Sequence, residues 1–373
     1  MKIATFYNLP FGGAKRVVYE HTKGLMNLGH TVDVYTLDKE ADMLSPGLVA
    51  NKEYRYNYSS LNMHVPVLSR ILLDLQVFHK LKNLHKKIAR DIDARGYDIV
   101  IVHTDTFTQA PFILRFLKTK NVYFCLEPLR MVYEYSLRIS SQLASFNKIY
   151  ESINRLVRKR IDRENARRAD FTLAISLFGR ECMISAFDMY PKISYLGVDQ
   201  TTFKPLGIKK KKQVLFVAEK EYIYGYDLAK KAIKLISENI RPSFKVVFGT
   251  KKKQRISDEE LVKIYNDSMV TLSLSRLDTF GLVPLESMAC GTPVIALNVA
   301  GYRETVEDGK TGFIVDFNPK EIAEKISRFM NDSLLSEKMG KEGRKSVEEK
   351  WTWELQIKKL DNLLQEFIAE DIL

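Results

Sequence analysis

The sequence predicts an α/β protein made of two doubly wound domains, each a parallel sheet covered by helices. Short apolar runs alternate with helical patterns along the chain, which is typical of consecutive βαβ units. The length of 373 residues suits two domains that each bury a core. The alternation is interrupted at 197–212, where Pro205, Gly207 and four consecutive lysines indicate a linker.

The expected strands are short and apolar. In the first half we expect them at Ile3–Tyr7, Val32–Thr36, Asp98–His103, Val122–Cys125 and Phe171–Ile175. In the second half we expect them at Val214–Val217, Lys245–Phe248, Val270–Leu274, Pro293–Ala296 and Gly312–Val315. Helices are expected to begin near Ala14 and near Val283, because Pro284 suits a first-turn position where its N–H is not needed. Such folds bind ligands at the carboxyl ends of the strands.

The composition is that of a globular chain with a strong positive charge. The hydrophobic share is 45%, the mean hydropathy is −0.19, the net charge is +12 and the pI is about 9.3. Nucleic acid, anionic lipid and phosphorylated substrates would each suit this charge. We expect no nucleic-acid partner, because the sequence has no zinc-finger, RNP or helix-turn-helix signature.

The sequence also indicates a location and a redox state. No apolar run reaches the roughly 18 residues of a spanning helix, and the first apolar stretch is too short for a signal sequence. We therefore expect the protein in the cytoplasm. Cys125, Cys182 and Cys290 lie in apolar contexts without metal-ligand spacing, which predicts buried free thiols.

The segment Asp278–Gly291, DTFGLVPLESMACG, carries the strongest functional signal. Seven residues separate the carboxylates of Asp278 and Glu286, and Phe280–Leu282 lies between them. A strand precedes the segment and a helix follows, so we expect Asp278 on the loop and Glu286 about one turn into the helix. Gly281 would let the backbone approach a ligand, and the helix start would offer N–H groups to an anion. The pattern suits a nucleotide-sugar, and the alternative is an ordinary acidic strand–turn–helix corner.

This segment resembles the acidic-x7-acidic motif of the retaining glycosyltransferases of family four (group 1 glycosyltransferases), which have the GT-B fold. Matching motifs run almost end to end at Gly12–Ala14, Arg16–Val18, Gly29–Val32, Gly197–Asp199, Ser257–Val262, Thr292–Ala296, Ala300-Gly301, Arg303–Val306 and Asp308–Phe313. The resemblance implies two Rossmann-like domains facing across a cleft. An acceptor-binding domain is expected at 1–200 with a returning C-terminal helix at about 355–373, and a nucleotide-sugar-binding domain at 201–354.

The resemblance also implies roles for the motif. The family's second carboxylate binds ribose hydroxyls, which implies that role for Glu286. Its first carboxylate contacts the donor sugar, and the amides that follow contact sugar hydroxyls or phosphates, which implies those roles for Asp278 and for Phe280, Gly281 and Leu282. Asp278 stands where the family usually has Glu. Because Asp is one methylene shorter, the identity of the sugar stays open.

The cations that usually bind the donor diphosphate in the family are absent from their usual positions. Relatives carry an Arg and a Lys after the first strand of the second domain, and these cations stabilise the departing nucleotide. Glu219 and Tyr224 stand at those positions here. Lys220, Arg276 or the lysines at 251–253 could supply the charge, or donor use has been lost or changed.

Candidate substrate contacts in the first domain follow its strands. The loop Gly12-Gly13 can point N–H groups at a substrate, although a plain tight turn would give the same sequence. Leu126 stands where many relatives have a catalytic-site His, and Glu127 and Arg130 follow it. His103 and Asp105, at the end of another strand, could also line the cleft. For Glu127, Arg130, His103 and Asp105, an ordinary loop or salt-bridge role is the alternative.

Two basic segments fall in the first domain. Apolar residues recur every three or four positions over 68–88, and the cations lie on other faces at Lys80, Lys82, Lys86, Lys87 and Arg90. Seven more cations fall within 155–168. One interpretation is a core helix with a solvated face. The other is a helix that binds the anionic inner face of a membrane peripherally, since relatives often glycosylate lipid-linked acceptors.

The sequence therefore predicts a retaining glycosyltransferase that moves a hexose from a nucleoside-diphosphate sugar to a hydroxyl acceptor on a glycan or lipid-linked glycan. We expect no cofactor and no metal, because helix N-termini and cations can carry the diphosphate charge. One alternative is a non-catalytic or altered-donor GT-B protein acting as a scaffold, which Glu219 and Tyr224 favour. Another is a basic nucleic-acid binder.

Overall fold

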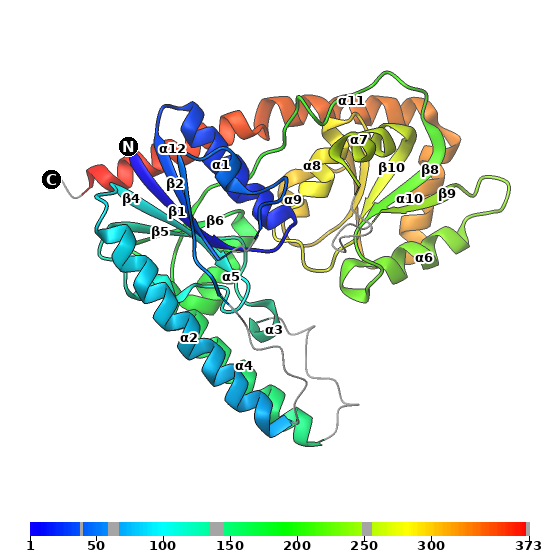
Figure 1. Ribbon diagram of the computed structural model, residues 1–373. Helices are drawn as coiled ribbons and strands as arrows, with labels where there is room; N and C mark the ends of the chain where they lie inside the picture. The colour runs from blue at the N-terminus through cyan, green and yellow to red at the C-terminus, as the bar shows by residue number, and fades with distance from the viewer. Residues whose placement is uncertain (38–39, 59–66, 134–144, 248–255, 371–373) are drawn as a thin grey trace. The chain divides into compact units, whose positions relative to one another are not determined.

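The computed structural model describes residues 1–37, 40–58, 67–133, 145–247 and 256–370 (Figure 1). This part of the chain forms two compact units. Unit 1 comprises Met1–Ile175, Arg180–Ser194 and the chain from Leu360, and unit 2 comprises Ser176–Gly179 and Tyr195–Lys359. Each unit is built around a parallel sheet with helices packed on it, so the predicted α/β class is confirmed.

The sheet of unit 1 has, within the described residues, the strand order β3-β2-β1-β4-β5-β6-β7. The strands are β1 Lys2–Asn8, β2 Thr31–Thr36, β3 Lys52–Arg55, β4 Ile99–Asp105, β5 Asn121–Cys125, β6 Phe171–Ala174 and β7 Lys192–Ile193. The chain builds the sheet outward from β1 in one direction and from β4 in the other. The loops after β1 and β4 therefore flank a topological switch point, which is where sheets of this kind bind ligands.

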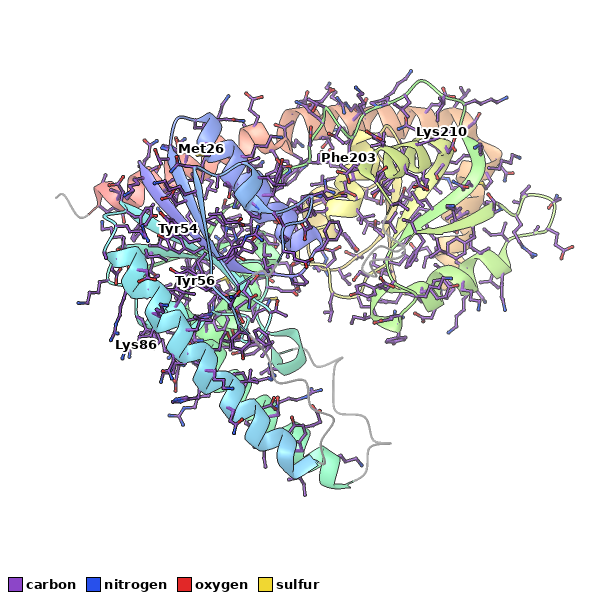
Figure 2. The ribbon with its side chains drawn as sticks, in the orientation of Figure 1. Met26, Tyr54, Tyr56, Lys86, Phe203 and Lys210 are labelled. Carbon is purple, nitrogen blue, oxygen red and sulfur yellow. The ribbon has the colours of Figure 1, made fainter. Side chains whose placement is uncertain are left out.

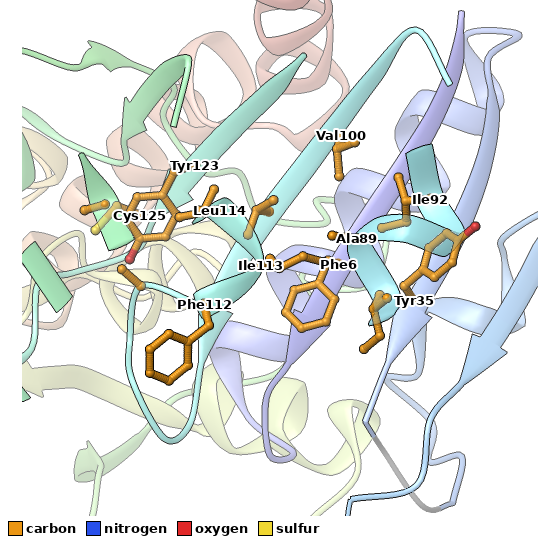
Figure 3. Packing of buried hydrophobic residues seen from close by; sticks show 14 of the residues in the cluster. Phe6, Tyr35, Ala89, Ile92, Val100, Phe112, Ile113, Leu114, Tyr123 and Cys125 are labelled. Carbon is orange, nitrogen blue, oxygen red and sulfur yellow. The ribbon is translucent and has the colours of Figure 1, made fainter. Parts of the chain in front are cut away.

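Helices cover this sheet on both faces. They are α1 Gly13–Asn27, α2 Val67–Asp93, α3 Arg130–Tyr133, α4 Ser145–Ala166 and α5 Leu177–Phe187, with 3-10 turns η1 Pro46–Leu48 and η2 Phe112–Arg115. Ala89 and Ile92 of α2 pack into the same core as Phe6, Val100 and Tyr123 of the sheet (Figure 3). The predicted basic face of α2 is solvated, and Lys86 points away from the helix (Figure 2). In its described part, α2 is thus a core helix.

The sheet of unit 2 has, within the described residues, the order β12-β11-β10-β8-β9. Its strands are β8 Lys211–Val217, β9 Ser243–Val247, β10 Ser268–Ser273, β11 Val294–Leu297 and β12 Gly312–Val315. Its helices are α6 Tyr226–Leu235, α7 Asp258–Asp267, α8 Leu282–Ala289, α9 Tyr302–Thr305, α10 Pro319–Asn331 and α11 Ser333–Lys350, with the 3-10 turn η4 Tyr222–Tyr224. The switch point lies between β8 and β10.

The helix α12 (Trp353–Ala369) begins in unit 2 and continues in unit 1. In unit 1, Asp361 binds His30 at 2.7 Å, Phe367 stacks on Phe171 at 4.8 Å, and Lys120 donates to the carbonyl of Ile368 at 3.2 Å. These partners stand just before, or at the start of, β2, β6 and β5. The end of α12 therefore lies at the amino ends of the strands, opposite the edge where ligands are expected.

The ten predicted strands are present, and two more were not predicted. The edge strand β3 has the polar sequence KEYR, and β7 has only two residues, so neither shows an apolar run. The predicted linker was too long, because β8 already begins at Lys211. Lys210 is half-buried beside Ser268, to whose carbonyl its Nζ donates at 3.1 Å, and this partial burial lowers the pKa of Lys210 to about 8. The cysteines are free as predicted, although Cys182 is only half-buried.

Three histidines are enclosed in the core of unit 1. Burial lowers the pKa of His21 and of His85 to about 3 each, and that of His103 well below its ordinary value. Within the described chain, neither ring nitrogen of His85 or of His103 has a hydrogen-bond partner. His85 packs against Phe6 with ring centroids 4.9 Å apart, and its Nε2 lies 3.8 Å from Asp105, whose pKa burial raises. The folded state therefore holds neutral imidazoles that unfolding exposes to protons.

This burial predicts a sensitivity to acid. A pKa depressed in the folded state means that the unfolded chain binds more protons below about pH 6.5, so stability falls with pH down to about pH 3. His85→Phe should remove the proton that His85 takes up on unfolding. As the pH falls through this range, the free energy of unfolding of the variant should therefore rise, relative to that of the native protein, by about 1.4 kcal/mol per pH unit. Denaturant titrations from pH 7 to pH 4 measure it.

The matched control is His79→Gln, because His79 lies exposed on the same helix. It should leave the pH dependence of unfolding unchanged. A His85→Phe protein that loses stability with acid as steeply as the native protein would contradict the assignment.

Candidate functional site

The acidic motif lies at the carboxyl end of β10, beside the switch point of unit 2. Gly281 caps α8 with a φ of 99°, in the left-handed region that favours glycine. Pro284 falls in the first turn, as predicted. Glu286 stands about one turn into α8, also as predicted, and is half-buried. The turn into α8 therefore forms because Gly281 can adopt a backbone conformation that would be strained for a residue with a side chain.

Asp278 closes this turn through its carboxylate. Its Oδ1 accepts hydrogen bonds from the N–H groups of Phe280 at 3.2 Å and Gly281 at 2.8 Å. Its Oδ2 accepts from the Tyr302 hydroxyl at 3.1 Å. The short Asp side chain suits such an Asx turn. The N–H groups of Phe280 and Gly281 thus donate to Asp278 in this structure, and the expected contacts of Phe280, Gly281 and Leu282 with a donor stay a prediction.

Glu286 is oriented by a buried tyrosine. The hydroxyl of Tyr265, a fully buried residue of α7, donates to Glu286 Oε2 at 2.9 Å. α7 itself begins at a capping serine, since Ser257 Oγ accepts from the N–H of Glu260. Cys290 lies one turn beyond Glu286, and burial, with a further contribution from Glu286, raises the pKa of Cys290 to about 12. The Glu286 carboxylate is therefore held in one direction.

The segment Gly301–Thr305 braces the motif loop from the other side. The N–H of Gly301 donates to the carbonyl of Asp278 at 3.0 Å. A Cβ at Gly301 would lie 2.4 Å from the Cα of Phe280, so only glycine fits there. Sequence reasoning matched Gly301 to the family but did not assign this role, because backbone proximity leaves no composition signal.

The loop between β8 and α6 is anchored by Arg276. The guanidinium binds Asp227 at 2.9 and 3.1 Å and lies 3.7 Å from the ring centre of Tyr222. The N–H of Arg276 donates to the carbonyl of Ile223 at 2.9 Å. The charge of Arg276 is therefore balanced by Asp227, which argues against its suggested role as a replacement phosphate cation.

The other candidates for that charge differ in position. Lys220 is exposed on the loop directly after β8, next to half-buried Glu219. Tyr224 is the last residue of η4 and half-buried. The lysines at 251–253 lie outside the described residues. Among the described candidates, Lys220 is the exposed cation at this edge of the sheet.

In unit 1 the predicted residues are distributed over several loops. Gly12, with a φ of 152°, caps α1, and Gly13 begins it, after β1 at the switch point. Glu127, which follows Leu126, is half-buried, and its backbone carbonyl accepts a hydrogen bond from the side-chain amide of Gln109 at 3.0 Å. Arg130 is the first residue of α3, and its side chain lies outside the described part of the structure.

His103 lies in the core of unit 1, not at the surface where it could contact a ligand. Its ring is fully buried, 5.3 Å from Phe124 and 5.5 Å from His21 between ring centroids. In this conformation no part of the imidazole reaches solvent. A buried charge that sequence reasoning missed is Lys15, in the first turn of α1, whose Nζ pairs with Asp42 at 2.9 Å.

Comparison with known proteins identifies the family. Residues 11–201 match Glycosyltransferase Family 4, and residues 249–346 match Glycosyl transferases group 1. The first match covers just over half of the chain. The chain belongs to glycosyltransferase family 4. The resemblance stated from the motifs is thereby confirmed.

Curated relatives align with part of the chain. The capsular polysaccharide biosynthesis glycosyltransferase CapM of Staphylococcus aureus is 38% identical over 110 residues, which are 29% of each chain. Spore coat protein SA of Bacillus subtilis is 29% identical over 209 residues, 44% of this chain and 55% of that protein. The chain thus spans less than two thirds of the length of these relatives.

Solved structures match along the whole chain. Sucrose-phosphate synthase from Thermosynechococcus elongatus has a TM-score of 0.72 at 16% identity, covering 99% of this chain and 100% of that one. Anabaena HepE, in complex with UDP and glucose, has a TM-score of 0.71 at 15% identity, covering 98% and 99%. At these identities the likeness concerns the fold, and it confirms the fold class of GT-B glycosyltransferases.

Two further properties follow from the described residues alone. No helix among them is long and apolar enough to cross a membrane. No group of three or more His, Cys, Asp or Glu side chains among them is placed to hold a metal ion.

The β8–α6 loop predicts a steric test of the site. A Cβ at Gly225, which has a φ of 77°, would lie 2.0 Å from the carbonyl oxygen of Leu274 at the end of β10. Gly225→Ala should therefore displace the loop. Gly309 has a similar φ of 71° and nothing within 4 Å of such a Cβ, so Gly309→Ala measures the backbone strain alone.

We expect Gly309→Ala to lower the free energy of unfolding by roughly 1–2 kcal/mol. Gly225→Ala should lose about 1–3 kcal/mol more, because the backbone is overpacked. Chemical denaturation of both variants measures the difference. Equal losses would mean that the loop does not rest against β10 in solution.

Proposed function

We propose that this protein is a retaining glycosyltransferase that moves a hexose from a nucleoside-diphosphate sugar to a hydroxyl acceptor on a glycan or lipid-linked glycan. The observation that carries the proposal is the Glu286 carboxylate, held by Tyr265 at the switch point of unit 2 in a family 4 chain. Structural neighbours solved with UDP or UDP-glucose support a nucleotide-sugar donor.

In this proposal Glu286 binds the ribose. A carboxylate accepts hydrogen bonds from two vicinal hydroxyls, and charge-assisted bonds of this kind are strong. The Tyr265 hydroxyl, which donates to Oε2 at 2.9 Å, keeps the carboxylate from turning away. Asp278 shapes the loop through its Asx turn, and its contact with the donor sugar depends on the space that this turn leaves.

The departing diphosphate needs positive partners, since its charge grows as the sugar leaves. Lys220 is the exposed cation after β8. The helix α6 begins at Tyr226 without a side-chain cap hydrogen bond among the described residues, so its first N–H groups suit an anion. The proposal needs no metal for this step.

The acceptor is assigned to unit 1. The loop Gly12-Gly13 lies at its switch point, and Glu127 and Arg130 follow β5. For retention, the acceptor hydroxyl attacks the face that the nucleotide leaves, without a protein nucleophile. The fully buried His103 is better suited to packing than to contact with the acceptor.

The scaffold alternative is less well supported. The loss of the usual cations at Glu219 and Tyr224 favours it, but the family match and the oriented Glu286 favour a transferase. No described feature of the site favours a nucleic-acid binder.

A ligand panel tests the proposal. UDP-, GDP- and ADP-sugars should be compared by thermal shift, because a ligand that binds only the folded state raises its stability. With the best nucleotide, Glu286→Ala should weaken binding about tenfold to a hundredfold, the loss of roughly 1.5–3 kcal/mol of charge-assisted bonding. Tyr265→Phe should weaken it less, since the carboxylate stays.

Glu259→Gln, an exposed change on the α7 helix that carries Tyr265, is the control and should bind as the native protein does. Calorimetric affinity that is unchanged in Glu286→Ala would remove the ribose assignment. A panel in which no sugar nucleotide shifts the melting temperature would favour the scaffold alternative.

We also propose that unit 1 binds anionic membranes through α4. Ile149, Ile153 and Leu156 are 58%, 45% and 67% exposed, and their spacing of four and three residues places them on one face of α4. Exposed Lys159 and Arg160 follow on the same helix. The other side of α4 faces α2, where the Tyr150 hydroxyl donates to Asp74 at 2.6 Å. An apolar stripe flanked by cations suits an anionic lipid surface.

The triple change Ile149→Gln, Ile153→Gln and Leu156→Gln should release the protein from anionic vesicles. Each cation near such a surface contributes on the order of 1 kcal/mol, so binding should also fall steeply with salt. Co-sedimentation measures both effects. Leu334→Gln is the control, because Leu334 is 72% exposed on α11 of unit 2. A native protein that stays in the supernatant at low salt would contradict the proposal.

A further inference from the structure

The chain passes between the two units at four places. The passages lie at Ile175/Ser176, Gly179/Arg180, Ser194/Tyr195 and Lys359/Leu360. The residues of unit 2 next to them are the first turn of α5, Tyr195 and the start of α12. The first turn of α5 and Tyr195 contact the motif loop or Glu304, which lies beside it.

The first turn of α5 is held by two hydrogen-bond acceptor groups, the carbonyl of Thr279 and the carboxylate of Glu304. Ser176 Oγ donates to the carbonyl of Thr279, inside the motif, at 2.6 Å. The N–H groups of Leu177 and Phe178 donate to the Glu304 carboxylate at 2.9 and 3.1 Å. A carboxylate at this end of a helix is also favoured by the helix dipole. Glu304 is thus a cap supplied from α9, far away in sequence.

The same carboxylate binds Tyr195, at the third passage. The Tyr195 hydroxyl donates to Glu304 Oε2 at 3.1 Å. The Tyr195 ring lies 6.2 Å from the ring of Phe280 and 5.3 Å from that of Trp351, and Phe280 and Trp351 lie 5.7 Å apart. Phe280 is a motif residue that is 1% exposed. Glu304 therefore orients the tyrosine against which the motif loop packs.

Glu304 is also joined to the motif through its own backbone segment. Gly301 donates to the Asp278 carbonyl at 3.0 Å, and the Tyr302 hydroxyl donates to the Asp278 carboxylate at 3.1 Å. Beside Tyr195, the backbone at Gly197 packs against the start of α12, because a Cβ at Gly197 would lie 2.4 Å from the backbone nitrogen of Trp353. These contacts pack the segments of the cluster closely together.

We propose that Glu304 is a positioning residue for glycosyl transfer, which ties the passages at α5 and Tyr195 to the loop that carries Asp278 and reaches Glu286. The inference rests on the proposed function. The nucleotide contacts assigned to Glu286 lie elsewhere on α8, so the loss of Glu304 should affect the placement of the reacting groups more than nucleotide affinity. A misplacement of about 1 Å lowers a rate on the order of a hundredfold.

The experiment compares Glu304→Ala, Glu304→Gln and Tyr195→Phe in the full chain. Glu304→Ala should lower kcat at least tenfold and change the affinity for UDP by less than threefold. Glu304→Gln should recover part of the rate, because its amide can still accept one helix N–H and meet the Tyr195 hydroxyl. Tyr195→Phe, which removes one hydrogen bond, should lose less than Glu304→Ala.

The matched control is Glu307→Gln. Glu307 lies three residues along and is paired with Lys310 and Lys350 at 2.8 Å each, and both partners lie outside the acidic motif Asp278–Gly291. It should lower the melting temperature without lowering kcat. A rate loss in Glu304→Ala that only follows the unfolded fraction, or that equals the loss in Glu307→Gln, would overturn the proposal.

A readout without catalysis separates this inference from the proposed function. Hydrogen exchange of peptides covering 276–285 and 177–187 should speed up in Glu304→Ala and not in Glu307→Gln. Unchanged exchange there would overturn the positioning role even in an active enzyme. A native protein that transfers no sugar, but shows this pattern of exchange, would contradict the proposed function while keeping the cluster around Glu304.

Discussion

The pairing of the Asp278 carboxylate with the N–H groups of Phe280 and Gly281 is the interaction on which the candidate site depends. It closes the last four residues of the β10–α8 connection into a turn that passes through a left-handed glycine and enters α8. The direction of α8 then fixes Glu286, and Tyr265 selects the direction of its carboxylate. Tyr302 satisfies the remaining Asp278 oxygen. The short side chain of Asp278 therefore determines where the longer carboxylate of Glu286 is placed.

The two sheets follow the same topological rule. In each unit the strand order reverses beside the first strand, so two loops diverge and leave room above the carboxyl edge of the sheet. In unit 1 the end of α12 lies at the amino edge, through Asp361 and Phe367. In unit 2 the diverging loops carry the acidic motif and the segment held by Arg276 and Asp227. Topology selects the edge, and side-chain pairing selects the shape of each loop.

The sequence predicted what depends on local pattern. Apolar runs located the buried strands, and the glycine and proline of the motif located the start of α8. What depends on distant partners could not be predicted. A polar edge strand such as β3 has no periodic signal. The Arg276–Asp227 pair joins a loop residue to the first turn of α6, and burial of His103 follows from its packing on His21 and Phe124. Periodicity found the apolar stripe of α2, but only the structure shows that core residues cover its described part, at Phe78, Leu81 and Ile88, and that α4 exposes another.

The course of α12 has a consequence for dissecting the protein. A fragment that ends at Ser194 contains all seven described strands of the first sheet, yet it lacks the turns of α12 that belong to the same unit. Such a fragment would leave the Phe171 ring, His30 and Lys120 without the partners that α12 supplies. An autonomous first domain therefore has to be made by splicing the end of the chain onto it, or by circular permutation, and not by truncation.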